Sequence, residues 1–317
     1  MKPLIFVTGM MKTGTTMLGG LLDGVDGICF YPEEPGFNYF FAKNKNVDNL
    51  VKNNYLAVSA ISYANSKDKD KEVIRGLDNS KTEQVVDINK FGKMCEELYG
   101  NFKYNRTSYY ENLYGVLNAW GKSHIKRLDW DYFGYKSPGF LKDPGYREEC
   151  EHIISNKSNR IIFILRKPSS ILASLYRHNE RVHGHYVRRE FIANIKFFIK
   201  SIYSMIGTMI WQRIFMSSYS KQVIAIEYEA LTVYPRRELE RLSRLLECST
   251  IKPRTTKLKF DHSPITAVES SPTGKIYQSS KSASNEFRWS VWENLFLAVV
   301  DKIYLFLFGS YLKCQKS

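Results

Sequence analysis

The sequence predicts a three-layer α/β fold, in which helices cover both faces of a central parallel sheet. Short apolar segments alternate along the chain with longer segments whose apolar residues recur at helical spacing. Residues 4–8, 160–165 and 223–226 are almost continuously apolar, which is typical of parallel strands buried on both faces. The chain has 317 residues, 44% of them hydrophobic, which is enough for a single domain with a substantial core.

The first predicted strand runs directly into a glycine-rich loop that opens a helix. Gly9 and Gly14 have the spacing of the phosphate-binding loop G-x-x-x-x-G-K-[ST], and Thr16 supplies its hydroxyl. Thr15 stands where that loop has its lysine, and Lys12, inside the loop, is the lysine present instead. Such a loop offers backbone N–H groups and the positive end of a helix to an anion. We therefore expect a phosphate-like ligand that requires a lysine at this unusual position.

The remaining elements follow in the same alternation. Residues 28–41 predict a short strand and a loop interrupted by prolines, and residues 42–130 predict a peripheral helical insertion. A further strand at 132–135 leads into the sequence KSPGF. Helical patterns mark residues 168–177, 188–215 and 236–247. We find no internal repeat or long low-complexity linker, so we expect residues 1–317 to form one domain with its ligand at the carboxyl ends of the strands.

Three segments of the chain carry a family resemblance. KTGTT, residues 12–16, resembles the 5′-phosphosulfate loop of sulfotransferases that use 3′-phosphoadenosine 5′-phosphosulfate (PAPS), which reads roughly K-[ST]-G-T-T. RIIFILRKPSSILASLYRH, residues 160–178, resembles the 3′-phosphate motif of the same family, a strand followed by R-x-P and a later serine. VIAIEYEALTVYPRRELERLSRLL, residues 223–246, is similar to the family's later strand and helix, where Y-E-x-L is typical. The three segments stand in family order.

The resemblance implies a P-loop-like 5′-phosphosulfate-binding loop and PAPS as the donor. It assigns the 5′ end of the donor to Lys12, Thr13, Gly14, Thr15 and Thr16. Within the loop, the lysine would reach the oxygen that bridges sulfur and the leaving phosphate, and no metal is needed where lysine and amides carry the charge. Arg166 and Ser174 would bind the 3′-phosphate, the first as a bidentate fork and the second as a hydroxyl donor. Residues 271–289 resemble the loop that closes over the nucleotide, with candidate contacts Gly274, Lys275 and Arg288.

The acceptor must lose a proton, which requires a general base nearby. Several bacterial members of the family carry a histidine shortly after a K-S-P segment, but YKSPGFL places Phe140 at that point. Glycan-modifying members have a glutamate after the second strand, and YPEEPGF provides Glu33 and Glu34 there. We expect Glu34 to be the base, Glu33 to be the second candidate, and Lys136 to be a second cation near the transferred group. The alternative interpretation is that both carboxylates belong to a solvated loop.

The formal net charge of +14 predicts an anionic ligand or partner. Together with the missing histidine and the EEP loop, it favours transfer to a hydroxyl or amine of a small-molecule or glycan acceptor, with a carbohydrate or glycolipid preferred. A P-loop kinase is the enzymatic alternative, although neither later strand ends in a clear magnesium-binding aspartate. A basic nucleic-acid-binding protein is the other alternative, but basic and aromatic residues are not interleaved as such binding requires. We expect no nucleic-acid partner.

The C-terminal residues 291–312 are strongly apolar but carry Asp301 and Lys302 at their centre. A membrane-spanning helix needs about 20 predominantly apolar residues with few or no charges. We therefore expect a helix that packs onto the core, with contact to a membrane surface as the alternative. The five cysteines are scattered without C-x-x-C pairs, and no signal segment precedes the first strand, so a cytoplasmic protein with reduced thiols is expected.

Overall fold

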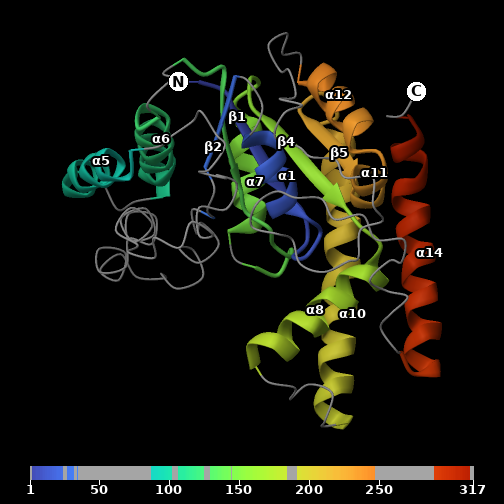
Figure 1. Cartoon of the computed structure of the whole chain (residues 1–317). Helices are drawn as coiled ribbons and strands as arrows, with labels where there is room; N and C mark the ends of the chain where they lie inside the picture. The colour runs from blue at the N-terminus through green and yellow to red at the C-terminus, as the bar shows by residue number, and fades with distance from the viewer. Residues whose placement is uncertain are drawn as a thin grey trace.

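Five parallel strands form the centre of the molecule. The computed structural model describes residues 2–23, 27–31, 34, 87–101, 106–124, 129–143, 145–183, 191–246 and 289–314. The strands lie in the order β2-β3-β1-β4-β5, and every neighbouring pair is parallel. They are β1 (Leu4–Thr8), β2 (Ile28–Phe30), β3 (Tyr132–Lys136), β4 (Arg160–Leu165) and β5 (Val223–Glu227). Helices cover both faces of this sheet (Figure 1), so the predicted three-layer α/β fold is confirmed.

Alternate residues of each strand enter two separate apolar cores, because side chains along a strand point to opposite faces. In β1, Ile5 and Val7 enter one core while Leu4 and Phe6 enter the other. The first core is completed by α1 (Thr15–Asp23), α11 (Tyr228–Val233) and α12 (Pro235–Leu245). All five residues of β1 are buried. This explains why the strand segments are continuously apolar rather than alternating.

The second core is larger and is covered by helices from most of the chain. These helices are α5 (Ile88–Asn101), α6 (Arg106–Lys122), α7 (Tyr146–Ser155), α8 (Pro168–His183), α10 (Phe191–Ser218) and α14 (Val291–Cys314). Figure 1 shows α5 and α6 beyond the β2 edge of the sheet, and α10 and α14 at the opposite side. Of the predicted helical insertion at 42–130, helices α5 and α6 are described, whereas residues 35–86 lie outside the described residues.

The segment after β3 is tied to the segment after β1, because both leave the sheet at its carboxyl edge. Ser137 N donates to Val7 O at 3.1 Å, and Gly139 N donates to Gly9 O at 3.0 Å. The Thr8 hydroxyl donates to Ser137 O at 2.8 Å. These bonds hold the KSPGF turn directly beside the glycine loop.

The two acidic residues of the apolar C-terminal helix α14, Glu293 and Asp301, have specific partners. The Asp301 carboxylate accepts the Ser169 backbone N–H at 3.1 Å and the Ser169 hydroxyl at 2.6 Å. It therefore caps the first turn of α8. At its own start, α14 has a capping box in which Ser290 N donates to Glu293 Oε2 at 2.8 Å. Asp301, which breaks the apolar pattern in the sequence, thus fixes α14 against α8.

Candidate functional site

The glycine loop between β1 and α1 has a backbone shape that few residues can adopt. Gly9 has a φ of 151°, Gly14 a φ of 103°, and Lys12 a left-handed φ of 67°. Thr13 closes the loop, since its N–H and its hydroxyl both donate to Met10 O, at 3.2 and 2.7 Å. Positive φ values are normal for glycine but cost a lysine about 1–2 kcal/mol. The loop is therefore held in a defined, locally strained conformation.

Close neighbours also exclude side chains at both glycines. A Cβ on Gly9 would lie 2.6 Å from Ile164 O in β4. A Cβ on Gly14 would lie 2.6 Å from Cδ2 of Tyr228. The glycine loop therefore packs closely against the end of β4 and against Tyr228, the residue that follows β5.

We predict that Gly14→Ala lowers the free energy of unfolding by about 2 kcal/mol or more, since the new methyl group meets an aromatic ring at an unfavourable φ. The matched control is Gly207→Ala in α10, where nothing lies within 4 Å of an added Cβ. That substitution should stabilise the protein by up to about 1 kcal/mol, because alanine favours the helix. Urea unfolding of both variants measures the difference, and equal stabilities would contradict the described loop packing.

The loop presents cationic and donor groups at the start of α1. Thr15 is the first residue of the helix and is buried, whereas Thr16 and Lys12 are half-buried. The first N–H groups of a helix have no partner within the helix, and the helix dipole adds positive potential there. The loop and the Lys12 ammonium together can therefore hold a phosphate-like or sulfate-like group.

Arg166, directly after β4, joins this loop from a distant part of the sequence. Its Nη1 donates to Lys12 O at 2.7 Å, and its guanidinium carbon lies 4.0 Å from the centre of the Tyr228 ring. Arg166 is only 8% exposed. Its Nε is buried and has no hydrogen-bond partner among the described residues. A buried guanidinium with a donor left over is suited to an anionic ligand.

Ser174 lies on α8, which starts two residues after Arg166, and its side chain is half-buried. The start of α8 is fixed by Asp301 of α14 through Ser169. Arg166 and Ser174 therefore belong to the same β4–α8 unit, and Arg166 is the one of the two with a described hydrogen bond to the glycine loop.

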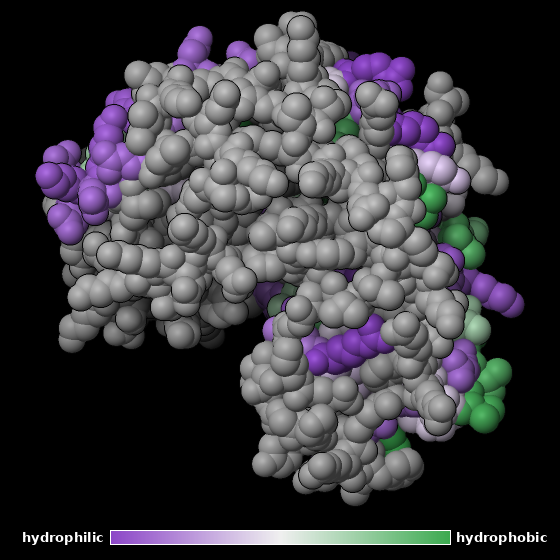
Figure 2. Space-filling model, viewed as in Figure 1, coloured by the Kyte–Doolittle hydropathy of each residue, from purple (hydrophilic) through white to green (hydrophobic). Residues whose placement is uncertain are grey.

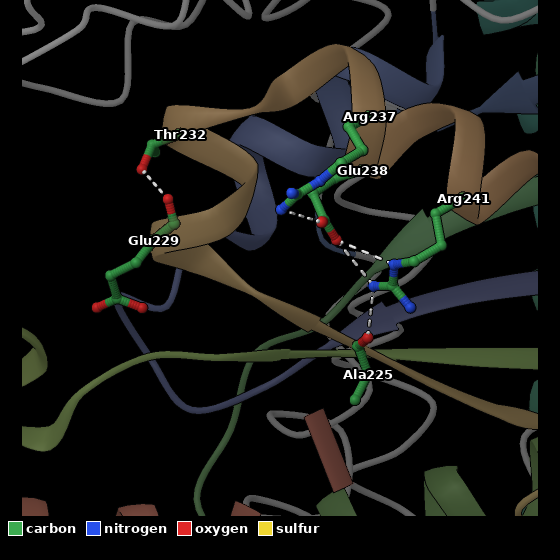
Figure 3. Close-up of polar contacts among 6 residues, drawn as sticks. All are labelled: Ala225, Glu229, Thr232, Arg237, Glu238 and Arg241. Atoms are coloured by element: carbon green, nitrogen blue, oxygen red, sulfur yellow. Dashed lines mark hydrogen bonds and ion pairs between the residues drawn. The ribbon is translucent and has the colours of Figure 1, made fainter. Parts of the chain in front are cut away.

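The middle of β5 is bonded to a buried ion pair of α12 (Figure 3). Arg241 in α12 donates to Glu238 at 3.0 Å and to Ala225 O in β5 at 3.0 Å. The carboxylate of Glu229, the second residue of α11, points away from this cluster in Figure 3. It accepts the Lys167 N–H at 3.4 Å, and burial raises the pKa of Glu229, an effect that nearby Arg166 partly opposes. Glu229 therefore belongs to the polar surroundings of Arg166.

Lys136 and Glu34, both predicted site residues, contact one another. Lys136 Nζ lies 3.1 Å from Glu34 Oε1, with side-chain exposures of 3% and 42% respectively. Lys136 is the last residue of β3, next to the turn that is bonded to the glycine loop. The ammonium of this ion pair is buried, whereas part of its carboxylate is exposed to solvent.

Glu149 is a buried acid beside the end of β3 that the sequence analysis did not single out. It lies in α7, is fully buried, and accepts the Tyr135 hydroxyl at Oε1 over 3.0 Å. Burial raises the pKa of Glu149 to about 8, although hydrogen bonds from Tyr135 and Ser137 work in the opposite direction and the charge of Glu34 raises it further. Tyr135 and Ser137 flank Lys136 in the chain. Glu149 thus contacts the end of β3 on the face to which Tyr135 points, which is opposite to the face of the neighbouring Lys136.

We predict that the free energy of unfolding falls as pH rises from about 5 to about 8, by up to about 1.4 kcal/mol per pH unit from this group. In that range the unfolded carboxyl, with a pKa near 4.5, is ionised, while the folded one retains its proton up to about 8. Glu149→Gln should flatten this slope, and Glu151→Gln, on the exposed side of α7, should not. Urea unfolding at four pH values measures the slopes. Identical slopes for all three proteins would contradict a neutral Glu149.

Some predicted site residues cannot be placed. Glu33, Gly274, Lys275 and Arg288 lie outside the described residues. Within the described part of the chain, no group of three or more His, Cys, Asp or Glu side chains could hold a metal ion. The candidate residues that the structure describes are therefore those of the glycine loop, Arg166 and Ser174 after β4, Lys136 at the end of β3 and Glu34 after β2.

Comparison with known proteins gives a consistent result. A model of the sulfotransferase family matches residues 3–252. The fold is similar to the crystal structure of a sulfotransferase from Alicyclobacillus acidocaldarius, with 14% identity, a TM-score of 0.51 and 100% of both chains covered. It is also similar to the sulfotransferase domain from the curacin biosynthetic pathway, with 13% identity, a TM-score of 0.50, and 95% of this chain and 98% of that chain covered. No curated protein sequence matches the chain. At these identities the two structures support the fold alone.

Proposed function

The chain belongs to the sulfotransferase family, and from this premise we propose that it transfers a sulfuryl group from PAPS to a hydroxyl or amine of an acceptor. The observation that carries the choice of donor is the contact between Arg166 and Lys12 O. It brings together two cationic segments, each suited to an anion, from residues that are far apart in the sequence. A donor with phosphates at both its 5′ and 3′ positions requires two such segments.

The residues present fit PAPS. The glycine loop, with Lys12, Thr15 and Thr16, would hold the 5′-phosphosulfate at the start of α1. The buried Nε of Arg166, which lacks a partner among the described residues, would donate to the 3′-phosphate. Ser174 on α8 would add a hydroxyl. When bound, PAPS supplies an activated sulfuryl group whose bond to the 5′-phosphate breaks as the acceptor bonds to sulfur.

Lys12 has the main electrostatic role in the proposed reaction. Negative charge develops on the oxygen between sulfur and the leaving phosphate, and a positioned cation stabilises that charge more in the transition state than in the ground state. Lys12 lies in the loop, with a left-handed φ of 67°, and not in helix α1. Its side chain therefore starts from the loop backbone. The unusual lysine position in the sequence is therefore suited to a sulfuryl leaving group.

Glu34 is the proposed general base. It would take the proton of the acceptor hydroxyl, and its half-exposed carboxylate is open to an acceptor on the side away from Lys136. Lys136 would keep Glu34 oriented and would contribute positive charge near the transferred group. The exposed side of this pair and the net charge of +14 favour an acidic or polar acceptor such as a carbohydrate or glycolipid.

We expect Glu34→Gln to lower kcat by about 10²- to 10⁴-fold with little change in donor affinity. The reason is that the glutamine amide is too weak a base to take the proton from the hydroxyl of the acceptor. Glu151→Gln is the matched control, since its carboxylate is 45% exposed and paired with Arg147, as Glu34 is 42% exposed and paired with Lys136. Transfer of labelled sulfate from PAPS, with acceptor saturating, measures both. Full activity of the Glu34 variant would exclude it as the base.

The proposed function is tested by incubating the protein with sulfur-labelled PAPS and a panel of glycans, glycolipids and phenols. Transfer of label to any acceptor supports the proposal, and the acceptor identifies the substrate class. A parallel reaction with γ-labelled ATP and magnesium tests for a kinase. Phosphate transfer without sulfuryl transfer would overturn the proposal in favour of that alternative.

A further inference from the structure

Helix α14 exposes an unusual amount of apolar surface. Phe306 is 85% exposed, Val291 79% and Leu295 65%. Together the exposed apolar residues of the helix form what we call the α14 apolar face: Val291, Leu295, Phe296, Val299, Leu305 and Phe306. Figure 2 shows hydrophobic residues along the edge of the molecule where α14 lies. Exposed apolar surface of this extent marks an interaction site rather than scattered surface residues.

The opposite side of α14 is fixed to the protein along its length. Leu297, Val300, Tyr304 and Phe308 are buried in the larger core. On the same side, the carboxylate of Asp301 holds the first turn of α8. By length and composition alone, residues Val291–Leu312 could cross a membrane. A helix with one side bound to its own domain and the other exposed is instead suited to lie in the plane of a membrane surface.

Among the described residues of α14, the exposed charge beside this face is positive. Lys302 is exposed within the α14 apolar face, seven residues after Leu295 and four before Phe306. Of the two acids of α14, Glu293 is buried and Asp301 is bonded to Ser169. The exposed charges of α14 that the structure describes are therefore positive.

Helix α10 packs beside α14 through contacts such as Phe198 with Trp292. It contains no acidic residue. Near its start it exposes Ile199 and Tyr203, at 58% and 82%, next to the exposed Lys196 and Lys200. Figure 1 shows that the first halves of α10 and α14 extend together beyond the sheet.

We propose that the α14 apolar face docks onto the surface of an anionic lipid bilayer, with Lys302 contacting lipid headgroups. Apolar side chains enter the boundary between headgroups and acyl chains, and lysines next to them gain from negative surface potential. A second copy of this chain fits the face less well. A symmetric dimer would bring the Lys302 residues of two copies towards one another without a carboxylate between them.

Docking would also orient the candidate active site. Asp301 connects α14 to the first turn of α8, two to three residues from Arg166. An acceptor carried by the same lipid surface would then meet a site held at a fixed position relative to that surface. The inference about docking does not depend on the proposed reaction, because lipid binding is measured without catalysis.

The test is co-flotation of the full chain with vesicles of phosphatidylcholine alone or with about 30 mol% phosphatidylserine. We expect binding to the anionic vesicles, little binding to the neutral ones, and a decrease as salt rises from about 0.1 to about 0.5 M. Val299→Glu should lower the fraction bound to anionic vesicles at least about tenfold. Val233→Glu on α11 is the matched control, since both valines are 56% exposed. Circular dichroism verifies that both variants fold.

Three outcomes would overturn the proposal. The first is failure of wild type to float with anionic vesicles. The second is equal loss of binding in both valine variants, which would make the effect unspecific. The third is a stable dimer in sedimentation that Val299→Glu dissociates, which would identify a second copy as the occupant. If Val299→Glu fails to fold, Lys302→Gln provides the same test through charge, and unchanged binding of that folded variant would count against lipid headgroup contact.

Discussion

Replacing Lys12 with glycine should lower kcat for sulfuryl transfer by about 10²- to 10³-fold while leaving the protein at least as stable as wild type. The ammonium is removed, so the developing charge on the leaving oxygen loses its cation. At the same time glycine adopts the φ of 67° without the cost that a lysine has there. The backbone carbonyl that accepts from Arg166 is retained. Activity and stability should therefore change independently.

Two measurements check this prediction. Single-turnover transfer from labelled PAPS gives the chemical rate, and thermal unfolding gives the midpoint Tm. Lys12→Arg is the control that keeps the charge, and it should retain more activity than the glycine variant despite its different shape. If Lys12→Gly is as active as wild type, Lys12 does not stabilise the leaving group. If it is inactive only because it unfolds, the described loop conformation is wrong.

Arg166→Ala should weaken binding of adenosine 3′,5′-bisphosphate, the desulfated donor, by at least about 30-fold, since removing one partner of a buried charged contact costs about 2–5 kcal/mol. It should also lower the free energy of unfolding by about 1–3 kcal/mol, because the half-buried Lys12 carbonyl loses its donor and the Tyr228 ring loses its cation. Arg166→Lys should rescue little, because an ammonium cannot reproduce the planar fork.

The control for Arg166 is Arg160→Ala, at the other end of the same strand. Arg160 donates to Lys157 O and Asn159 O, away from the glycine loop. Isothermal titration should find its affinity for the bisphosphate close to that of wild type. Equal losses in the two variants would indicate a general disturbance of β4 instead of a phosphate contact.

Much of the fold could be predicted because its signals are local. The continuous apolar segments of β1, β4 and β5, and the glycine loop that opens α1, are properties of adjacent residues. Glu34 and Lys136 could be named as candidates because each stands in a short segment at or after the end of a strand, whereas their contact appears only in the structure. In each case a short stretch of sequence contains the physical cause.

The remaining features depend on contacts between distant segments. Glu149 lies among the acids of the segment YREECE, and only its burial behind Tyr135 distinguishes it from its exposed neighbours. Asp301 interrupts an apolar pattern in the sequence, whereas in the fold it caps α8. Tyr228 belongs to the expected strand-to-helix turn, but its position against Gly14 and Arg166 requires the assembled sheet. Periodicity does not encode such contacts.

The central claim is that two separate cationic segments bind the two phosphate ends of one donor. The most direct measurement is isothermal titration of wild type and Arg166→Ala with adenosine 3′,5′-bisphosphate and with adenosine 5′-monophosphate. We predict that wild type binds the bisphosphate at least about tenfold more tightly, and that Arg166→Ala abolishes this preference by weakening the bisphosphate alone. Equal affinity of wild type for both nucleotides, or a preference that survives in Arg166→Ala, would contradict the account.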